Sequence, residues 1–275
     1  MLHRRQLSYG TAGLLGFSAA AVGVLAAQAV AARRTIGPRR TVPPYHDGRY
    51  LPRDGARGGT SIRIAVLGDS GAAGLGVDHA AETMGAVIAH GVADALRRPV
   101  VLTNHAVVGA QTKDLDAQID RALTAYPQVA VIMVGANDVT HLVPVALSAR
   151  RLEAAVARLR AAGAQVVMGT CPDLGTVRPI SPPLRQLMRR YSRRLAARQG
   201  GATLAAGGRP VLLGDLIGPE FDAYPEVMFS VDRFHPSADG YAAAAQALLP
   251  EVIAALRRGP TGGMLPEAYV PPAPR

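Results

Sequence analysis

Short runs of continuous apolar residues alternate along the middle of the chain with longer stretches in which apolar residues recur every three or four positions. The continuous runs lie at residues 62–68, 100–104, 129–135, 165–170 and 211–213. They are typical of strands covered on both faces. The periodic stretches, at residues 84–97, 115–123, 146–162, 184–199 and 238–256, predict amphipathic helices. This alternation predicts an α/β fold, a three-layer α/β/α sandwich around a parallel sheet with right-handed crossovers.

The predicted helix at 184–199 has the clearest apolar stripe, formed by Leu184, Met188, Tyr191 and Leu195. Six arginines cover its other sides: Arg185, Arg189, Arg190, Arg193, Arg194 and Arg198. A solvated surface accounts for these charges more simply than contact with anionic lipid, although the pattern fits both.

The N-terminal residues 1–33 are predicted to be a signal peptide or a membrane anchor. No residue from position 6 to position 32 is charged, and Arg4 and Arg5 precede this stretch. Its length would cross a hydrocarbon core of about 30 Å as a helix. Small residues at positions 27, 29 and 31 resemble signal-peptidase sites. Four arginines between positions 33 and 40 favour a cleaved signal, because basic residues prefer the cytoplasmic side. A helix buried in the domain is the weaker alternative, since the segment lacks a polar face.

Changes in composition predict the remaining boundaries. Residues 34–60 are rich in Arg, Pro and Gly and are predicted to form a linker or a strap on the surface. Residues 61–257 contain all the predicted strands and helices and form one domain. Residues 258–275 include Pro260, Pro266 and Pro274 and are predicted to be a proline-rich tail.

The formal charge of +10 does not indicate a nucleic-acid-binding protein. Residues 1–40 hold six arginines and no acid, which leaves 24 basic against 20 acidic residues in the rest of the chain. Aromatic residues make up 4% and tryptophan is missing, so little is available to stack on bases. Cys171 is the single cysteine, which excludes an intrachain disulfide and a cysteine metal cluster.

The candidate chemistry lies at Ser70, Asp232 and His235. Ser70 stands in Gly-Asp-Ser-Gly at the end of the first predicted strand, the edge of an open parallel sheet where ligand sites gather. A helix N-cap is the alternative role for this serine. Asp232 and His235 are three positions apart before the last predicted helix, so one turn would bring the carboxylate to an imidazole nitrogen. Together they would supply a nucleophile, a base and an orienting carboxylate.

Two further residues follow predicted strands and could bind an oxyanion. Asn137 offers a side-chain amide and Gly109 offers an unobstructed backbone N–H, although both residue types also suit ordinary turns. Trypsin-like proteases also place serine in Gly-Asp-Ser-Gly, but their histidine and aspartate precede it. The G-x-S-x-G elbow of α/β-hydrolases is missed, because position 72 is alanine.

At these residues the chain resembles the SGNH (GDSL-type) hydrolase family over about residues 62–245. The four residues that name the family fall on Ser70, Gly109, Asn137 and His235, and Asp232 completes the triad. Gly71 departs from the Gly-Asp-Ser-Leu pattern at a position that carries no chemistry. The resemblance implies a flavodoxin-like fold with a five-stranded parallel sheet in the order 2-1-3-4-5. It also implies an oxyanion hole made by Ser70, Gly109 and Asn137, with no metal and no cofactor.

The function expected from this resemblance is hydrolysis of carboxylic esters through an acyl-enzyme. Because no large insertion could form an apolar lid, short or medium acyl chains are expected rather than long-chain triglycerides. Lipid esters and acetylated sugars both remain open as substrates. The alternative is a non-catalytic member of the fold that binds carbohydrate or lipid in the same cleft. The N-terminal segment predicts an exported protein, either secreted or held on the outer side of the cytoplasmic membrane.

Overall fold

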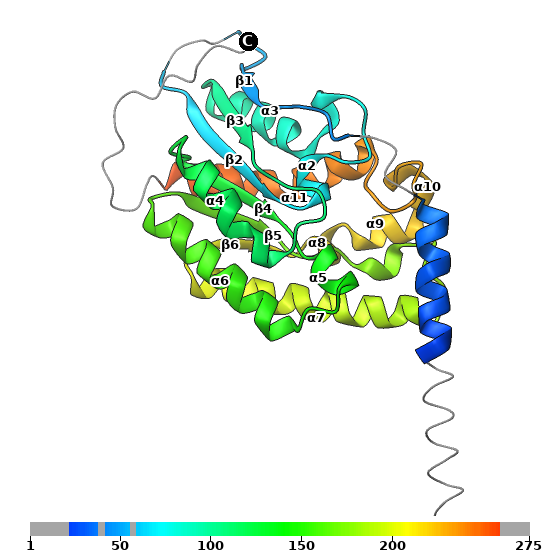
Figure 1. Ribbon diagram of the computed structural model, residues 1–275. Coiled ribbons are helices and arrows are strands. Elements are labelled where there is room, and N and C mark those ends of the chain that lie inside the picture. Colours follow the sequence, from blue (N-terminus) through cyan, green and yellow to red (C-terminus); the bar gives the residue numbers. More distant parts are fainter. Residues whose placement is uncertain (1–21, 38–41, 56–58, 259–275) are drawn as a thin grey trace, which may run out of the picture.

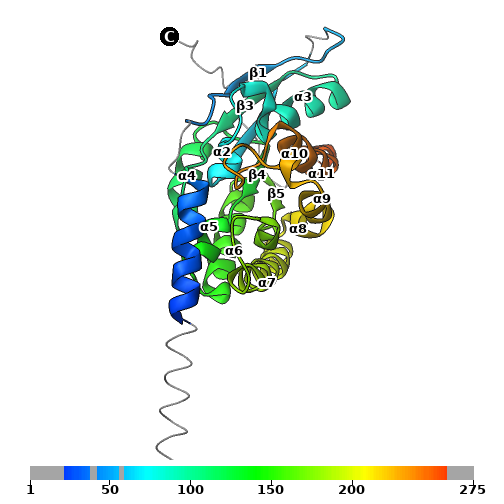
Figure 2. The same cartoon turned by 90° about the vertical axis from the view of Figure 1, so that its right-hand side faces the viewer.

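The computed structural model describes residues 22–37, 42–55 and 59–258. In these residues a central sheet of six strands has the order β1-β3-β2-β4-β5-β6, and helices cover both of its faces (Figures 1 and 2). The strands are β1 (Gly48–Tyr50), β2 (Ile62–Gly68), β3 (Val100–Asn104), β4 (Val129–Met133), β5 (Gln165–Gly169) and β6 (Arg209–Val211). The predicted α/β class and the order of the five parallel strands are confirmed.

The longer helices are α3 (Met84–Leu96), α4 (Leu115–Leu123), α6 (Val145–Ala161), α7 (Leu184–Ala205) and α11 (Ala238–Arg257). The shorter ones are α2 (Ser70–Ala73), α5 (Ala136–Thr140), α8 (Leu213–Leu216), α9 (Gly218–Ala223) and α10 (Pro225–Met228). The five predicted helices agree with the longer helices to within one residue at each end, except at the end of α7.

The two faces of the sheet follow from the alternation of side chains along each strand. Ile62, Ile64 and Val66 of β2 pack in one apolar cluster with α3 and α11. Ala65 and Leu67 of the same strand pack in a second cluster with α4 and α6. Helix α7 lies beside α6 and contacts β6, so it extends this second layer past the last strand.

Helix α7 continues to Ala205, past the predicted end at residue 199. The pair Gly200-Gly201 is a typical helix terminator, but Gly200 is buried within α7, where a Cβ would lie 3.4 Å from the Leu212 side chain. Ala202 and Thr203 are buried as well, so packing keeps the helix going through the glycines. The prediction for the last strand was also shifted, because residue 213 already begins α8 and the strand starts earlier, at Arg209.

The sheet has one strand more than predicted. Strand β1 lies inside residues 34–60, the segment predicted as a linker, and pairs antiparallel with β3. Its neighbour His46 is 4% exposed, and the ring Nε2 of His46 lies 2.7 Å from the Asn104 side-chain nitrogen. This part of the segment is therefore fixed onto the domain.

Residues 22–36, at the end of the uncharged N-terminal stretch, form a helix that lies against the side of the domain next to α10 and the start of α7 (Figures 1 and 2). The Gln28 amide donates to the Pro182 carbonyl at 2.5 Å and accepts from the Leu184 N–H at 3.1 Å. Ala32 is 5% exposed and belongs to the same apolar cluster as Met188 and Phe229. Within the described residues, no helix combines the length and the apolar character needed to cross a bilayer. The predicted start of the signal or anchor, residues 1–21, and the tail from residue 259 lie outside the described residues.

Candidate active site

The predicted nucleophile lies where β2 turns sharply into α2. Gly68 ends β2 at φ +139°, and a Cβ there would lie 1.9 Å from the Met133 carbonyl oxygen of β4. Only glycine permits this close approach of the two strands. The Asp69 carboxylate caps α2 by accepting from the Gly71 N–H at 3.0 Å. The N-cap is therefore Asp69, and Ser70 is the first residue of the helix, with its hydroxyl free for another partner.

That partner is His235, which the fold brings from 165 residues further along the chain. The Ser70 Oγ lies 3.0 Å from the His235 Nε2, and the His235 Nδ1 lies 2.6 Å from the Asp232 Oδ2. This is the connectivity of a nucleophile, a general base and an orienting carboxylate. Ser237 caps α11 by accepting from the Gly240 N–H at 3.1 Å, so the turn that carries His235 ends at a fixed helix start.

The Asp232 carboxylate is held by its own turn. Its Oδ1 accepts from the Ser230 hydroxyl and from the backbone N–H groups of Phe234 and His235, each at 2.9 Å. Partial burial acts to raise the pKa of Asp232, but the hydrogen bonds and the charge of His235 outweigh it. The pKa of this carboxyl consequently falls well below its usual value. Asp232 is therefore ionised at any pH near neutrality and available to orient the imidazole.

The two predicted oxyanion donors lie on neighbouring loops that are tied to each other. Gly109 follows β3 with φ +88°, a conformation that favours glycine. Asn137 is the second residue of α5, and its Nδ2 donates to the Ala110 carbonyl at 3.1 Å. The buried Asp138 binds the same loop, because its carboxylate accepts from the Thr112 hydroxyl at 2.7 Å and from the Thr112 N–H at 3.1 Å. These bonds hold the Gly109 loop beside Asn137.

Asp69 links these loops to the nucleophile, a role that sequence reasoning did not give it. Its carboxylate accepts from the Gly71 N–H at 3.0 Å, and the Gly135 N–H at the start of α5 also favours its ionised form. Burial raises its pKa to about 6, although the Gly71 and Gly135 N–H groups and the charge of His235 act in the opposite direction. An acidic residue directly before Ser70 was the available signal, since Asp is a preferred N-cap. Ser230, which binds Asp232, gave no signal in the sequence.

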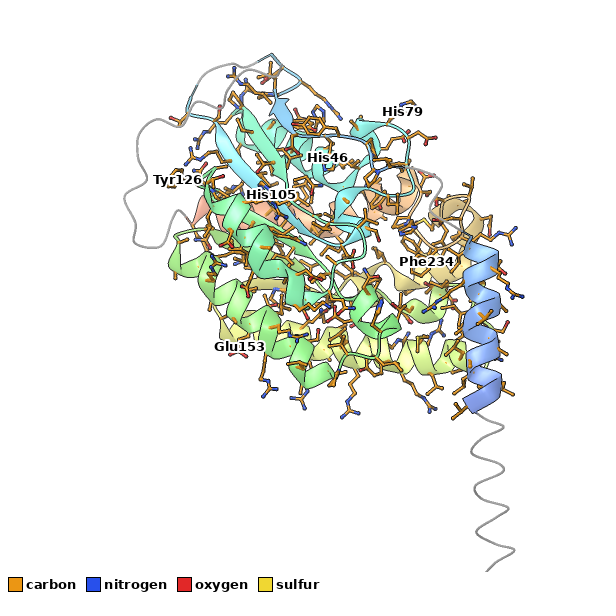
Figure 3. The ribbon with its side chains drawn as sticks, viewed as in Figure 1. His46, His79, His105, Tyr126, Glu153 and Phe234 are labelled. Atoms are coloured by element: carbon orange, nitrogen blue, oxygen red, sulfur yellow. The ribbon has the colours of Figure 1, made fainter. Side chains whose placement is uncertain are left out.

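An apolar cavity of about 100 Å³ opens beside Ser70 and His235. Its lining includes Met133 from β4, Leu213 and Ile217 from the α8 region, Phe221 from α9, and Phe229 and Phe234 from the segment around the last turn. Of these residues, Phe234 is labelled in Figure 3. Burial raises the pKa of the nearby Cys171 thiol well above its usual value, which disfavours the reactive thiolate form of this side chain. The cavity draws its walls from segments that are far apart in the sequence, so the sequence alone did not predict it.

The fold and the linked serine, histidine and aspartate are those of an SGNH-type carboxylic ester hydrolase. The chain belongs to the GDSL-like lipase/acylhydrolase family, whose family model matches residues 66–243. It is 42% identical over 265 residues to the GDSL-like esterase Rv1075c of Mycobacterium tuberculosis, a match that covers 90% of this chain and 83% of that protein. The predictions of the family and of an ester hydrolase are thus confirmed.

Solved structures share the fold at lower identity. The lipase/acylhydrolase of Enterococcus faecalis superposes with a TM-score of 0.57 at 22% identity, covering 70% of this chain and 96% of that one. The psychrotrophic esterase EstA of Pseudoalteromonas sp. gives 0.55 at 21% identity, with 71% and 98% covered. The acetylxylan esterase Axe2 of Geobacillus stearothermophilus gives 0.52 at 18% identity, with 70% and 95% covered.

Proposed function

We propose that this protein hydrolyses carboxylic esters with short or medium acyl chains through a covalent acyl-enzyme. The Ser70 Oγ attacks the acyl carbon while the His235 Nε2 takes its proton, and the same imidazole returns the proton to the leaving alcohol. Asp232 holds the proton-bearing Nδ1 of His235. Water then attacks the acyl carbon of the acyl-enzyme while His235 takes its proton, and return of this proton to the Ser70 oxygen releases the acid. The hydrogen-bonded chain from Ser70 through His235 to Asp232, at 3.0 and 2.6 Å, carries the proposal.

The tetrahedral intermediate needs donors for its oxyanion. The backbone N–H groups of Ser70 and Gly109 and the side-chain amide of Asn137 fill this role in the proposal. Asn137 uses one amide hydrogen on Ala110, which fixes the orientation of the side chain and leaves the second hydrogen for the substrate. Such a preorganised donor is typically worth about 10²–10³ in turnover.

The size and polarity of the cavity beside Ser70 support a short acyl group. Its volume of about 100 Å³ is small beside the roughly 300–1,000 Å³ that is typical of ligand pockets. Its aliphatic and phenyl lining favours a hydrocarbon chain over a charged acyl group. Lipid esters and acetylated sugars both fit as substrates, and the acetylxylan esterase among the structural relatives makes the second class worth testing.

A non-catalytic member that binds carbohydrate or lipid in this cleft is the alternative. Binding alone does not require the hydrogen-bonded chain from the Ser70 hydroxyl through His235 to the ionised Asp232 carboxylate. The test is a set of p-nitrophenyl esters from acetate to decanoate, followed by acetylated polysaccharides, together with labelling by a fluorophosphonate probe. EstA is described as inhibited by monoethylphosphonate, which makes a phosphonate a sensible probe. Hydrolysis and labelling that disappear in Ser70→Ala support the enzyme, and their absence from the wild-type protein supports the binding alternative.

We also infer that the protein is exported and that its N-terminal segment stays attached. The uncharged stretch behind Arg4 and Arg5 supports export. The contacts of Gln28 support retention, because both candidate cleavage sites lie inside the helix of residues 22–36 and cleavage would separate Gln28 from the domain. N-terminal sequencing of the mature protein tests retention. A periplasm-active reporter fused after Arg40 tests export, and a reporter that works only in the cytoplasm would contradict it.

A further inference from the structure

The apolar cavity shares part of its wall with a second groove. This outer polar groove has a volume of about 340 Å³, and the cavity and the groove share four lining residues: Asp173, Thr176, Gly214 and Gly218. Two segments therefore form the wall, the loop after β5 and the stretch from α8 into α9. The contacts between these two segments keep the cavity separate from the groove.

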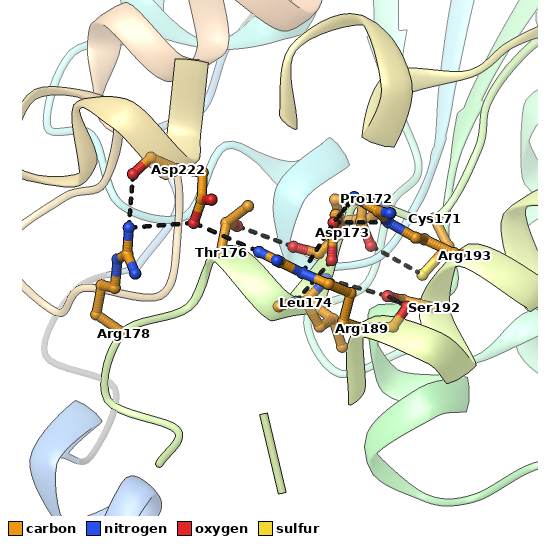
Figure 4. Close-up of polar contacts among 11 residues, drawn as sticks. Cys171, Pro172, Asp173, Leu174, Thr176, Arg178, Arg189, Ser192, Arg193 and Asp222 are labelled. Atoms are coloured by element: carbon orange, nitrogen blue, oxygen red, sulfur yellow. Dashed lines mark hydrogen bonds and ion pairs between the residues drawn. The ribbon is translucent and has the colours of Figure 1, made fainter. Parts of the chain in front are cut away.

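Arg189 of α7 joins the two segments from outside (Figure 4). Its Nε lies 3.4 Å from the Asp173 Oδ2 on the loop, and its Nη2 lies 3.4 Å from the Asp222 Oδ1 on α9. Arg178, at the end of the loop, reaches the same α9 residue, with its Nη2 2.6 Å from the Asp222 carbonyl and 3.1 Å from the Oδ1. The guanidinium of Arg189 thus contacts a carboxylate on each side of the wall.

The loop side of this contact is buried and well ordered by hydrogen bonds. The Asp173 side chain is 2% exposed, and it accepts from the Gly175 N–H at 2.8 Å and from the Arg193 guanidinium at 2.9 Å. Arg189 lies directly over this loop, since a Cβ on Gly175 would come within 2.1 Å of its Nε. A buried carboxylate needs its cationic partners, so loss of one loosens the segment it holds.

We propose that Arg189 closes the far end of the acyl-side cavity by holding Asp173 and Asp222, and so sets the longest acyl chain that the enzyme accepts. Arg189 is a positioning residue that acts through the wall and touches neither Ser70 nor the substrate. The inference rests on the proposed function, since it assigns the cavity beside Ser70 to the acyl group. Without Arg189, the contact of Arg178 with Asp222 is the remaining described ion pair between the loop and α9, so the wall between the cavity and the groove is loosened and the cavity can accept a longer chain.

The test compares Arg189→Met with Arg190→Met in the full chain. Methionine keeps an unbranched apolar stem and removes the guanidinium. Arg190 is the neighbouring exposed residue on the same helix, with no ion pair to any residue that the structure describes, so it controls for the loss of one positive charge. The measurement is kcat/KM for p-nitrophenyl acetate, butyrate, hexanoate, octanoate and decanoate, with thermal unfolding as a check on folding.

Arg189→Met should raise the octanoate-to-acetate ratio of kcat/KM by about tenfold or more, because each additional buried methylene contributes about fourfold. Arg190→Met should keep the wild-type ratio. Asp222→Asn, which weakens the contacts of both Arg189 and Arg178 with α9, should raise the ratio in the same direction and serves if Arg189→Met fails to fold.

An unchanged ratio in folded Arg189→Met, or an equal loss on every ester, would overturn the role of Arg189 while leaving the esterase assignment intact. A wild-type protein that neither hydrolyses these esters nor labels with the phosphonate probe would overturn the proposed function and this inference with it.

Discussion

Replacing Asp69 with asparagine should change how the free energy of unfolding varies with pH. At any single pH the free energy itself should change less. The Asp69 carboxyl is buried, and its pKa in the folded protein is about 6, against about 3.9 for an unfolded chain. Between these values the folded protein holds a proton that the unfolded chain has lost. The free energy of unfolding therefore falls as the pH rises from about 4 to about 6 and levels off above that range.

The shift in pKa gives the size of this effect. It amounts to about two units, and each unit is worth about 1.4 kcal/mol, so ionisation of Asp69 should cost the folded state about 3 kcal/mol by pH 7. Asparagine avoids this cost because it stays neutral. It also weakens the hydrogen bonding of this side chain, since its NH₂ group cannot accept from a backbone N–H, and the loss of one such bond costs about 1–3 kcal/mol at every pH. Asp69→Asn should thus be less stable than wild type at pH 4 and as stable or more stable at pH 7.

Guanidinium chloride denaturation of both proteins at pH 4, 5, 6 and 7, at fixed ionic strength, measures this difference. Other titrating groups are common to the two proteins and cancel when the free energies are subtracted. The matched control is Asp78→Asn, because Asp78 is exposed and should give the wild-type pH dependence. A difference between Asp69→Asn and wild type that stays constant from pH 4 to pH 7 would refute the buried ionisation of Asp69.

The other predictions concern catalysis. Ser70→Ala should lower ester hydrolysis by several orders of magnitude without loss of fold, and retention of more than about one percent of the activity would exclude Ser70 as the nucleophile. Asn137→Ala should lower kcat by about 10²–10³ with little change in KM, whereas an effect on KM alone would assign Asn137 to substrate positioning. A histidine base must be neutral to take the serine proton, so kcat/KM should fall at acid pH. Full activity at pH 4 would rule out His235 as the base.

The sequence predicted the central strands, the long helices and the catalytic side chains because each has a local signal. Buried parallel strands must be apolar throughout, and a long helix with one buried side must show its period. Asp232 and His235 are three positions apart, so a single turn suffices to join them, as the 2.6 Å contact shows. Ser70 at a strand end, followed far along the chain by Asp232 and His235, forms a combination that is specific to few classes of protein.

The remaining features depend on contacts between distant segments. The helices α8 and α9 have four and six residues, too few to display a helical period, yet they line the cavity beside Ser70. The helix of residues 22–36 docks through the Gln28 amide and the small Ala32 side chain, neither of which stands out in an uncharged stretch. The burial of Asp69 follows from the close approach of Gly68 to β4, which no local pattern reveals.

Strand β1 also covers the edge of β3, where unpaired backbone groups could otherwise bind a strand of another chain. A free strand edge is a template on which another chain can add its own strand and begin an aggregate. The three residues Gly48–Tyr50 occupy that edge of β3, and at the opposite boundary Pro210 of β6 lacks the N–H that pairing would use. A shortened protein that starts at residue 61 would keep Ser70, Asp232 and His235 but uncover β3. Its solubility, rather than its chemistry, should be the first property to suffer.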